Sequence, residues 1–220
     1  MLDWGSIDTV LLDMDGTLLD LHFDNHFWQE HMPRRYAERH KLPQDAARAD
    51  LSARYSAKVG TLDWYCVDYW SRELQLDIET LKQEVAHLIA VHPDVPEFLN
   101  ALRLRGKRVL LVTNAHHKSL ALKMARTGLA THFDELITSH DIGLPKENTA
   151  FWPALRTKHP FDPMRTLLID DSLPVLRSAR VGGIAHLLAV YHPDSRQPQK
   201  DVEEFTAFRR FADITPSRSA

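Results

Sequence analysis

The stretch LLDMDGTLLD, residues 11–20, ends an apolar run in two aspartates that stand one residue apart. Asp-Gly at positions 15 and 16 is a common turn signal, and the leucines that follow could open the second strand of a hairpin. The alternative interpretation is that a buried strand delivers Asp13 and Asp15 to a chemical centre. The rest of the chain decides between a plain turn and a functional one.

Length and composition indicate a globular protein. The 220 residues are 44% hydrophobic, enough for one large domain or for a domain with a smaller insertion. The net charge of -3 lacks the basic excess of a nucleic-acid binder, so no nucleic-acid polymer is expected as a partner. Without a signal-peptide pattern or a long apolar run, we expect no membrane partner. The single cysteine, Cys66, suits a reducing compartment and predicts a cytoplasmic protein.

Short apolar runs alternate with helical patterns along the chain. The predicted strands are residues 9–13, 108–113, 135–139, 166–170 and 186–190. Helices are expected to end near Gly106 and Gly128. Near-continuous apolar strands must be covered on both faces, so the order predicts an α/β fold with a doubly wound, mostly parallel, Rossmann-like sheet. A last helix is expected to dock through Phe205, Phe208 and Phe211.

Residues 22–92 interrupt this alternation. They contain no convincing strand, but they hold several helical segments and seven of the ten Trp and Tyr residues. The breaks between these segments fall near Pro43, Gly60 and Asp77. We therefore predict an inserted helical cap at 22–92, with its aromatic residues mostly forming a small core. The α/β catalytic core is predicted to comprise residues 1–21 and 93–220.

Polar residues follow the predicted strands at the carboxyl edge of the sheet, where open α/β sheets bind ligands. They are Asp13, Asp15, Thr113, Asn114, Lys146, Asp170 and Asp171. Four carboxylates beside one ammonium are unfavourable unless a cation compensates the excess negative charge. Mg²⁺ prefers oxygen ligands and would allow a phosphate to bind beside the lysine. A carboxyl group that keeps its proton would then serve a leaving oxygen.

Four motifs in this order, DMDGT at 13–17, TN at 113–114, the lysine at 146 and DD at 170–171, resemble those of the haloacid dehalogenase-like superfamily. That superfamily consists chiefly of Mg²⁺-dependent phosphatases, and the insertion after the first motif resembles its helical cap. The resemblance implies that Asp13 is a nucleophile that becomes an aspartyl phosphate. It implies that Asp15 is first a general acid and then a base, with its backbone carbonyl reaching the metal.

The same resemblance assigns the remaining motif residues. Thr113 and Lys146 are expected to bind the phosphate as part of the catalytic set. Asp170 and Asp171 are expected to complete the Mg²⁺ site with Asp13 and Asp15. Asp171 stands where the direct metal ligand usually falls, with Asp170 nearby, although the reverse order is open.

Longer strings resemble one branch, the bacterial GMP/IMP 5′-nucleotidases. They are DTVLLDMDGTLLDLHFDNHFW, LDWYCVDYWSRELQLDI, LVTNAH and GLPKE. This resemblance implies hydrolysis of a purine nucleoside 5′-monophosphate, a small-molecule phosphate ester. Trp64 and Asp68 stand four apart, so one helix would place an aromatic ring for stacking beside a carboxylate that accepts the base N1 proton. Packing within the cap is the alternative for the aromatic residues. Asp24, Asn114 and His116 are further candidate substrate contacts.

Other functions remain open at this stage. Sugar-phosphate phosphatases and phosphomutases of the same superfamily share the DxDGT pattern. The carboxyl group of Asp15 disfavours dehalogenation, because a departing halide needs no proton donor. A non-catalytic binding or regulatory module would be expected to have lost a charged motif residue, and a signalling receiver lacks so long an insertion after its first strand. A monomer or a small homo-oligomer is expected.

Overall fold

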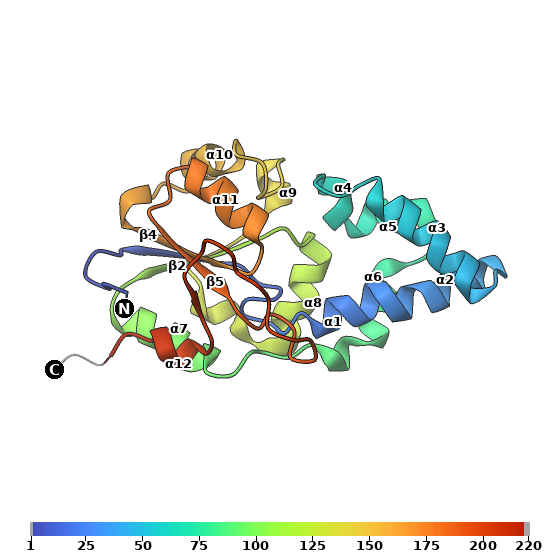
Figure 1. Cartoon of the computed structure of the whole chain (residues 1–220), viewed down its shortest axis with the longest axis horizontal. Helices are drawn as coiled ribbons and strands as arrows, with labels where there is room; N and C mark the ends of the chain where they lie inside the picture. The colour runs from blue at the N-terminus through green and yellow to red at the C-terminus, as the bar shows by residue number, and fades with distance from the viewer. Residues whose placement is uncertain (1, 218–220) are drawn as a thin grey trace.

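The computed structural model describes residues 2–217 and contains a six-stranded parallel sheet (Figure 1). The strands are β1 Thr9–Leu12, β2 Arg108–Thr113, β3 Glu135–Thr138, β4 Thr166–Asp170, β5 His186–Val190 and β6 Ala207–Phe208. Their order across the sheet is β3-β2-β1-β4-β5-β6, and every neighbouring pair is parallel. The predicted α/β class is confirmed, and β1 lies at its centre. The two-residue strand β6 escaped prediction because it carries no apolar run.

Helices cover both faces of the sheet. On one face lie α7 Val95–Leu104, α8 His117–Thr127 and α12 Phe211–Ile214. On the other lie α10 Phe151–Lys158 and α11 Leu173–Val181, above the sheet in Figure 1. Successive side chains of β1 alternate between the two layers, since Val10 and Leu12 pack on the first face and Leu11 on the second. Both faces are therefore apolar, as the near-continuous apolar strands predict.

Short helices fill several connections of the α/β part. They are η3 Leu129–His132, α9 Ser139–Ile142 and η4 Pro163–Arg165. The expected ends of α7 and α8 are confirmed, because Gly106 and Gly128 both have positive φ angles just past the last helical turn. Over residues 2–217, no helix is both long enough and apolar enough to cross a membrane.

The helices of the insertion all lie between β1 and α7, to the right of the sheet in Figure 1. They are α1 His22–His26, η1 Phe27–His31, α2 Met32–His40, α3 Gln44–Ser56, α4 Leu62–Tyr65, α5 Val67–Leu74, α6 Ile78–Glu84 and η2 Ala86–Leu88. The expected breaks are confirmed: Pro43 precedes α3, Gly60 lies between α3 and α4, and Asp77 caps α6. These helices share their own apolar core around Phe27 and Trp70.

The C-terminal region departs from the expected helix. Phe205 precedes β6 and packs on the face covered by α10 and α11, whereas Phe208 lies within β6 and packs on the opposite face. Only Phe211 belongs to α12, which is four residues long. The prediction of one helix docked through all three phenylalanines is therefore wrong, because pairing with β5 extends the chain at Phe208.

Candidate active site at the carboxyl edge of the sheet

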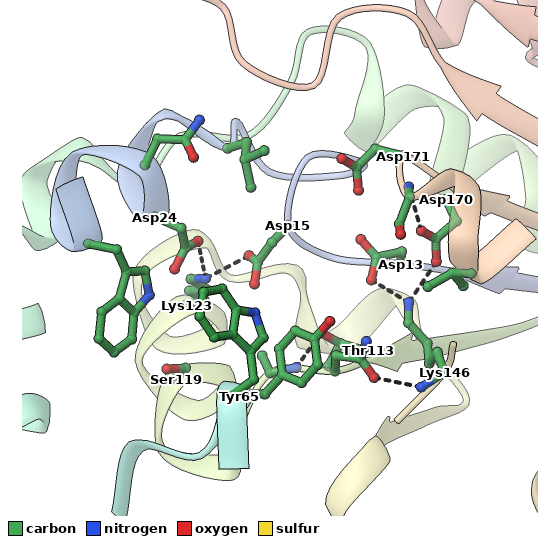
Figure 2. Close-up of a pocket in the computed structure, with 18 of the residues that line it drawn as sticks. Asp13, Asp15, Asp24, Tyr65, Thr113, Ser119, Lys123, Lys146, Asp170 and Asp171 are labelled. Atoms are coloured by element: carbon green, nitrogen blue, oxygen red, sulfur yellow. Dashed lines mark hydrogen bonds and ion pairs between the residues drawn. The ribbon is translucent and has the colours of Figure 1, made fainter. Parts of the chain in front are cut away.

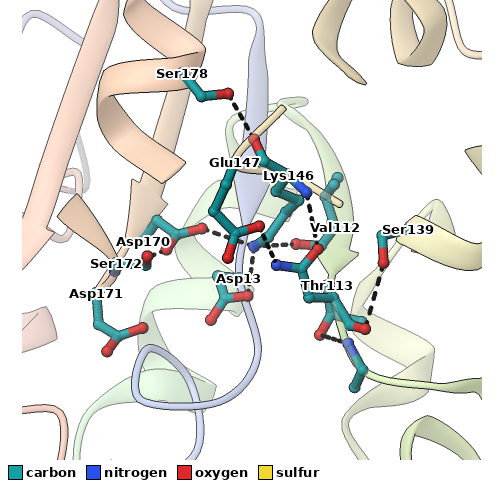
Figure 3. Close-up of polar contacts among 12 residues, drawn as sticks. Asp13, Val112, Thr113, Ser139, Lys146, Glu147, Asp170, Asp171, Ser172 and Ser178 are labelled. Atoms are coloured by element: carbon teal, nitrogen blue, oxygen red, sulfur yellow. Dashed lines mark hydrogen bonds and ion pairs between the residues drawn. The ribbon is translucent and has the colours of Figure 1, made fainter. Parts of the chain in front are cut away.

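Lys146 joins the ends of three neighbouring strands. Its Nζ donates to Asp13 Oδ1 at 2.6 Å, to Asp170 Oδ2 at 2.7 Å and to the Val112 carbonyl at 2.9 Å (Figure 3). These three acceptors follow β1, end β4 and lie in β2, and the lysine itself is 1% exposed. Burial opposes the charged ammonium, but Asp13 and Asp170 outweigh it and raise the pKa of Lys146. Lys146 is therefore a fixed positive charge beside Asp13.

Three carboxylates gather at this position. Oxygens of Asp13, Asp170 and Asp171 lie within 4.8 Å of one another. Burial, with Asp170 adding to it against the effect of Lys146, raises the pKa of Asp13 to about 6. Burial and then Asp170 and Asp13 raise the pKa of Asp171 well above its usual range. Buried carboxylates that repel one another in this way match the ligand set of a divalent cation such as Mg²⁺.

Asp170 and Asp171 differ in their bonding. Both oxygens of Asp170 are engaged, because Oδ2 accepts from Lys146 and Oδ1 accepts from the Ser172 backbone N–H at 2.9 Å. The nearest cationic partner of the Asp171 carboxylate within residues 2–217 is Lys200, at 3.9 Å. Asp171 consequently keeps oxygen lone pairs for a ligand, whereas Asp170 shares its own with the protein.

Gly16 allows Asp171 to approach the turn after β1. Its φ angle is +83°, and a Cβ atom built on it would lie 2.8 Å from Asp171 Cγ. A larger residue would have to displace that carboxyl group and adopt an unfavourable backbone conformation. The Asp-Gly pair therefore forms a turn, and this turn brings the ends of β1 and β4 together.

A second set of contacts surrounds Asp15. Lys123 on α8 donates to Asp15 Oδ1 and to Asp24 Oδ2, both at 2.6 Å (Figure 2). Lys82 on α6 donates to the other oxygen of Asp24, Oδ1, at 3.0 Å. The contacts therefore run from the sheet through α8 and α1 to α6. They connect the first motif to the helices of the insertion.

The two carboxyl groups in this set have opposite pKa shifts. Burial raises the pKa of Asp15 to about 6, with nearby Asp24 and Asp13 adding to it and Lys123 opposing it. Burial also disfavours the Asp24 carboxylate, but Lys123 and Lys82 outweigh it and lower its pKa to about 2. Asp24 is therefore charged near neutral pH, while Asp15 is poised to exchange a proton.

The second motif, Thr113 and Asn114, is held in place by the carboxylate of Glu147. Asn114 accepts from the Lys146 backbone N–H at 2.9 Å and donates to Glu147 at 2.9 Å. The Tyr65 hydroxyl on α4 also donates to Glu147, so this glutamate links the insertion to the sheet. Thr113 Oγ1 accepts from the Ala115 backbone N–H at 3.0 Å. Asn114 therefore positions the loop that carries Lys146.

One cavity of about 310 Å³ unites these residues. Its polar end includes Asp13, Asp15, Thr113, Lys146 and Asp171, and its other wall comes from the insertion (Figure 2). That wall includes four aromatic residues, Trp28, Tyr55, Trp64 and Trp70. Their rings pack edge to face, with centroid separations from 5.0 to 6.5 Å. The expected stacking residue Trp64 therefore lines the cavity, within a larger aromatic cluster.

The predicted partnership of Trp64 with Asp68 is wrong. The chain is extended at Cys66, with φ -85° and ψ 110°, so Trp64 belongs to α4 and Asp68 to α5. Asp68 pairs with Lys118 at 2.9 Å, and His116 lies 3.8 Å from it. His116 caps α8, its Nδ1 accepting from the Lys118 backbone N–H. Among the described residues that line the cavity, neither Asp68 nor His116 is present.

Three charged residues of the cavity were not predicted: Lys82, Lys123 and Glu147. Lys123 stands three residues after Leu120, on the apolar side of a predicted helix, where a buried lysine signals an acidic partner. Glu147 follows Lys146 directly. Lys82 follows the buried Leu81 in the insertion, but its partner Asp24 is 58 residues away. That separation left no local signal for the pair.

The fold and this site define the class of protein. The chain belongs to the haloacid dehalogenase-like hydrolases, whose family model matches residues 7–183. It is 40% identical to the GMP/IMP nucleotidase YrfG of Escherichia coli K12, over 97% of this chain and 96% of that protein. It is 28% identical to a phosphoglycolate phosphatase of Nitrosospira multiformis, over 90% of this chain and 88% of that one. The chain is therefore a hydrolase.

A solved structure shares the fold. The crystal structure of a HAD phosphatase from Thermococcus onnurineus superposes with a TM-score of 0.79 at 22% sequence identity. The match covers 94% of this chain and 96% of that one, so the likeness extends over the insertion as well as the sheet.

Proposed function

We propose that this chain is a Mg²⁺-dependent 5′-nucleotidase that hydrolyses purine nucleoside 5′-monophosphates, GMP and IMP foremost, to the nucleoside and phosphate. One observation carries the proposal: a single cavity joins the carboxylates beside Lys146 to a wall of aromatic rings. The first end suits a phosphate and the second suits a stacked base. The activity of the relative from Escherichia coli supports the same substrate class.

Asp13 is the nucleophile in this proposal. Its carboxylate oxygen attacks phosphorus, the bond to the nucleoside 5′-oxygen breaks, and an aspartyl phosphate forms. Lys146, 2.6 Å from Asp13, neutralises charge on the phosphoryl oxygens. Thr113 binds the same phosphoryl group, and Asn114 holds the loop of Lys146 in place.

Asp15 carries the proton in both half-reactions. It gives its proton to the departing 5′-oxygen, and the resulting carboxylate then takes one from the water that attacks the aspartyl phosphate. The second step releases phosphate and restores both aspartates. Lys123 donates to Asp15 at 2.6 Å, and this contact supports an orienting role for the lysine.

Mg²⁺ fits the acidic end of the cavity. We propose that Asp13, Asp171 and the backbone carbonyl of Asp15 hold the ion, with Asp170 beside them. The unshared oxygens of Asp171 favour it as the direct ligand, because those of Asp170 already accept hydrogen bonds. When bound, the ion supplies positive charge that offsets the carboxylates and the phosphate.

The proposal extends to the organisation of the chain. Residues 22–92 form a cap domain, and residues 1–21 and 93–220 form the catalytic core. The contacts from Tyr65 to Glu147 and from Asp24 to Lys123 hold the cap over the cavity and exclude water during phosphoryl transfer. We further propose that the enzyme acts in the cytoplasm on a free nucleotide, as a monomer or a small homo-oligomer.

Phosphate release tests this function. The purified protein is assayed with Mg²⁺ or with EDTA on GMP, IMP, AMP, phosphoglycolate and several sugar phosphates. Metal-dependent preference for GMP and IMP is expected, and Asp13→Asn should abolish it. Asp45→Asn, an exposed aspartate in the first turn of α3, serves as the matched control and should retain full activity.

Other outcomes would overturn the assignment. Preference for phosphoglycolate or a sugar phosphate would make the chain a different phosphatase of the family. Transfer of phosphate to a second sugar position would make it a phosphomutase. No phosphate release from any ester would point to a binding or regulatory module.

A further inference from the structure

Lys82 differs from the other two lysines of the cavity in how many protein acceptors it has. Within residues 2–217, Lys146 donates to three acceptors and Lys123 to two. The ammonium of Lys82 donates to one, Asp24 Oδ1, at 3.0 Å. An ammonium group has three N–H donors, so two of those on Lys82 are open to a ligand.

The surroundings of Lys82 isolate it from solvent. The residue is 3% exposed, and its Nζ lies 4.6 Å from the ring centroid of Phe27, 5.1 Å from that of Phe23 and 5.4 Å from that of Trp28. Aromatic faces stabilise a cation but do not accept a full hydrogen bond from it. A buried ammonium with open donors gains most from a ligand that presents oxygen or nitrogen lone pairs.

Lys82 lies on the cavity wall away from the phosphate end. The contacts from Asp15 to Lys123, from Lys123 to Asp24 and from Asp24 to Lys82 separate it from the first motif. Tyr55 lines the same wall, and its hydroxyl is buried with no hydrogen-bond partner among the described residues. The Lys82 ammonium and the Tyr55 hydroxyl can therefore both bind a ligand beside the aromatic rings, where the proposed nucleotidase would hold the base.

The purine bases differ in what they offer to an ammonium. Guanine and hypoxanthine carry a carbonyl oxygen, O6, next to the acceptor N7, and lysine donates well to this edge. Adenine has an amino group at the same position, which presents N–H donors instead. A buried ammonium facing that amino group would lose a hydrogen bond and meet a like partial charge.

We propose that Lys82 is the residue that selects 6-oxopurine nucleotides, donating to O6 of guanine or hypoxanthine and rejecting adenine. The proposal rests on the nucleotidase function proposed above and names the group that sets its base preference. Asp24 holds the ammonium in place, and the Tyr55 hydroxyl supplies a second contact to the base.

Substrate preference tests the role of Lys82. The values of kcat/KM for GMP, IMP and AMP are compared between the wild-type enzyme and Lys82→Met. The GMP to AMP ratio is expected to fall about tenfold or more in the variant, the discrimination that one such contact provides. A residue that only supports Asp24 would lower all three values together and leave the ratio unchanged, and that result would overturn the proposal.

Lys58→Met is the matched control. Lys58 also pairs with a carboxylate, Asp63 at 2.8 Å, and lies over an aromatic ring, that of Tyr69 at 4.7 Å. It is not among the described residues that line the cavity, so its removal should leave the ratio intact. Circular dichroism checks that both variants are folded, and Lys82→Gln replaces Lys82→Met if the latter does not fold.

Removing O6 from the substrate provides a second, independent measurement. Purine riboside 5′-monophosphate has hydrogen in place of O6, so wild-type kcat/KM should favour IMP over it, and Lys82→Met should abolish that preference. Equal values in the wild-type enzyme would overturn the role of Lys82. Wild-type enzyme that hydrolyses none of the three nucleotides would overturn the nucleotidase function as well. Equal values for GMP, IMP and AMP in the wild-type enzyme, or an intact preference in Lys82→Met, would overturn the role of Lys82 alone.

Discussion

At the scale of single residues, the lysine partners of the cavity aspartates determine the chemistry that each aspartate can perform. Asp13 and Asp15 stand one residue apart, yet each pairs with a different lysine, Lys146 and Lys123. In the proposed mechanism, these separate partners let Asp13 act as the nucleophile while Asp15 carries the proton. An isolated pair of aspartates at this spacing would lack that division of work.

Loss of Lys123 should damage both stability and activity. Lys123→Met leaves the partly buried carboxylates of Asp15 and Asp24 without their shared, fully buried partner, which should lower the free energy of unfolding by about 3–5 kcal/mol. Because Asp15 loses its orientation, kcat/KM should fall about 100-fold for every nucleotide. Urea unfolding and steady-state kinetics measure the two effects. Lys118→Met, at an exposed position of the same helix, should be much milder, and equal losses in both variants would contradict the account.

Alanine substitutions at Gly16 and Gly183 distinguish the effect of backbone strain from the effect of displacing Asp171. Both have positive φ angles, +83° and +87°, so alanine at either should cost about 1–3 kcal/mol of unfolding free energy. A Cβ at Gly183 would meet no described atom within 4 Å, whereas one at Gly16 would displace Asp171. Only Gly16→Ala should lose Mg²⁺-dependent phosphate release. Full activity in Gly16→Ala would show that the position of Asp171 is unimportant.

Tyr55 carries a hydroxyl that the fold itself does not use. Because this group is buried without a partner in the described chain, Tyr55→Phe should leave the free energy of unfolding unchanged or raise it by about 1 kcal/mol. The KM for GMP should rise, since the substrate loses a contact. Tyr36→Phe is the contrast, because its hydroxyl donates to Asp50 at 2.6 Å and its loss should destabilise the protein. Thermal or urea unfolding decides between these outcomes.

The motif aspartates and Thr113 could be predicted from the sequence because each of them stands at the end of a recognisable strand. Asp13, Thr113 and Asp170 each finish an apolar run, and parallel strands bring such ends to one edge. Lys82 and Lys123 lie on helices instead, and their carboxylate partners are 58 and 99 residues away at Asp24. No period in the sequence links residues that meet only after the insertion has folded over the sheet.

At the scale of elements, the backbone at Cys66 shows why helical spacing can mislead. LDWYCVDYW has aromatic residues at intervals typical of one helix, but the extended residue between α4 and α5 turns Trp64 toward the cavity and Asp68 toward α8. The thiol of Cys66 then accepts from the Tyr69 backbone N–H and caps α5. Cysteine is a rare cap, so the sequence offered no standard signal for this break.

His140 on α9 should make stability depend on pH. Its ring nitrogens are buried without partners in the described chain, and burial, followed by His116 and His117, lowers its pKa to about 4. The unfolded chain binds this proton below about pH 6.5, while the folded chain does not until about pH 4. The contribution of His140 to the free energy of unfolding is therefore highest above pH 6.5, and it falls as the pH drops toward 4.

Urea unfolding at pH 7.5 and pH 4.5 measures this contribution. His140→Gln should reduce the loss of unfolding free energy between the two pH values by about 1–2 kcal/mol, after allowance for the partial exposure of the ring. His87→Gln, at an exposed position of η2, should leave the loss unchanged. If His140→Gln loses as much stability in acid as the wild-type chain, this histidine is not the source.

At the scale of the whole molecule, the α/β sheet and the inserted helices contribute different kinds of residue to one cavity. The α/β part supplies Asp13, Asp15, Asp170, Asp171 and Lys146, and the insertion supplies the aromatic wall, Asp24 and Lys82. The sequence predicted the sheet well, because five continuous apolar strands leave few alternatives. It predicted the helices of the insertion but not how they face the sheet, since that depends on pairs such as Tyr65 with Glu147.

The proposed mechanism requires that Asp13 becomes phosphorylated while GMP is hydrolysed. The most direct test is to mix enzyme, Mg²⁺ and GMP, stop the reaction within milliseconds, and reduce any aspartyl phosphate with borohydride to homoserine. Mass spectrometry of the digested protein then locates the homoserine. Homoserine is expected at position 13 and nowhere else in the wild-type protein, and none is expected in Asp13→Asn. Homoserine at position 15 or 171, or hydrolysis of GMP without any modified aspartate, would contradict it.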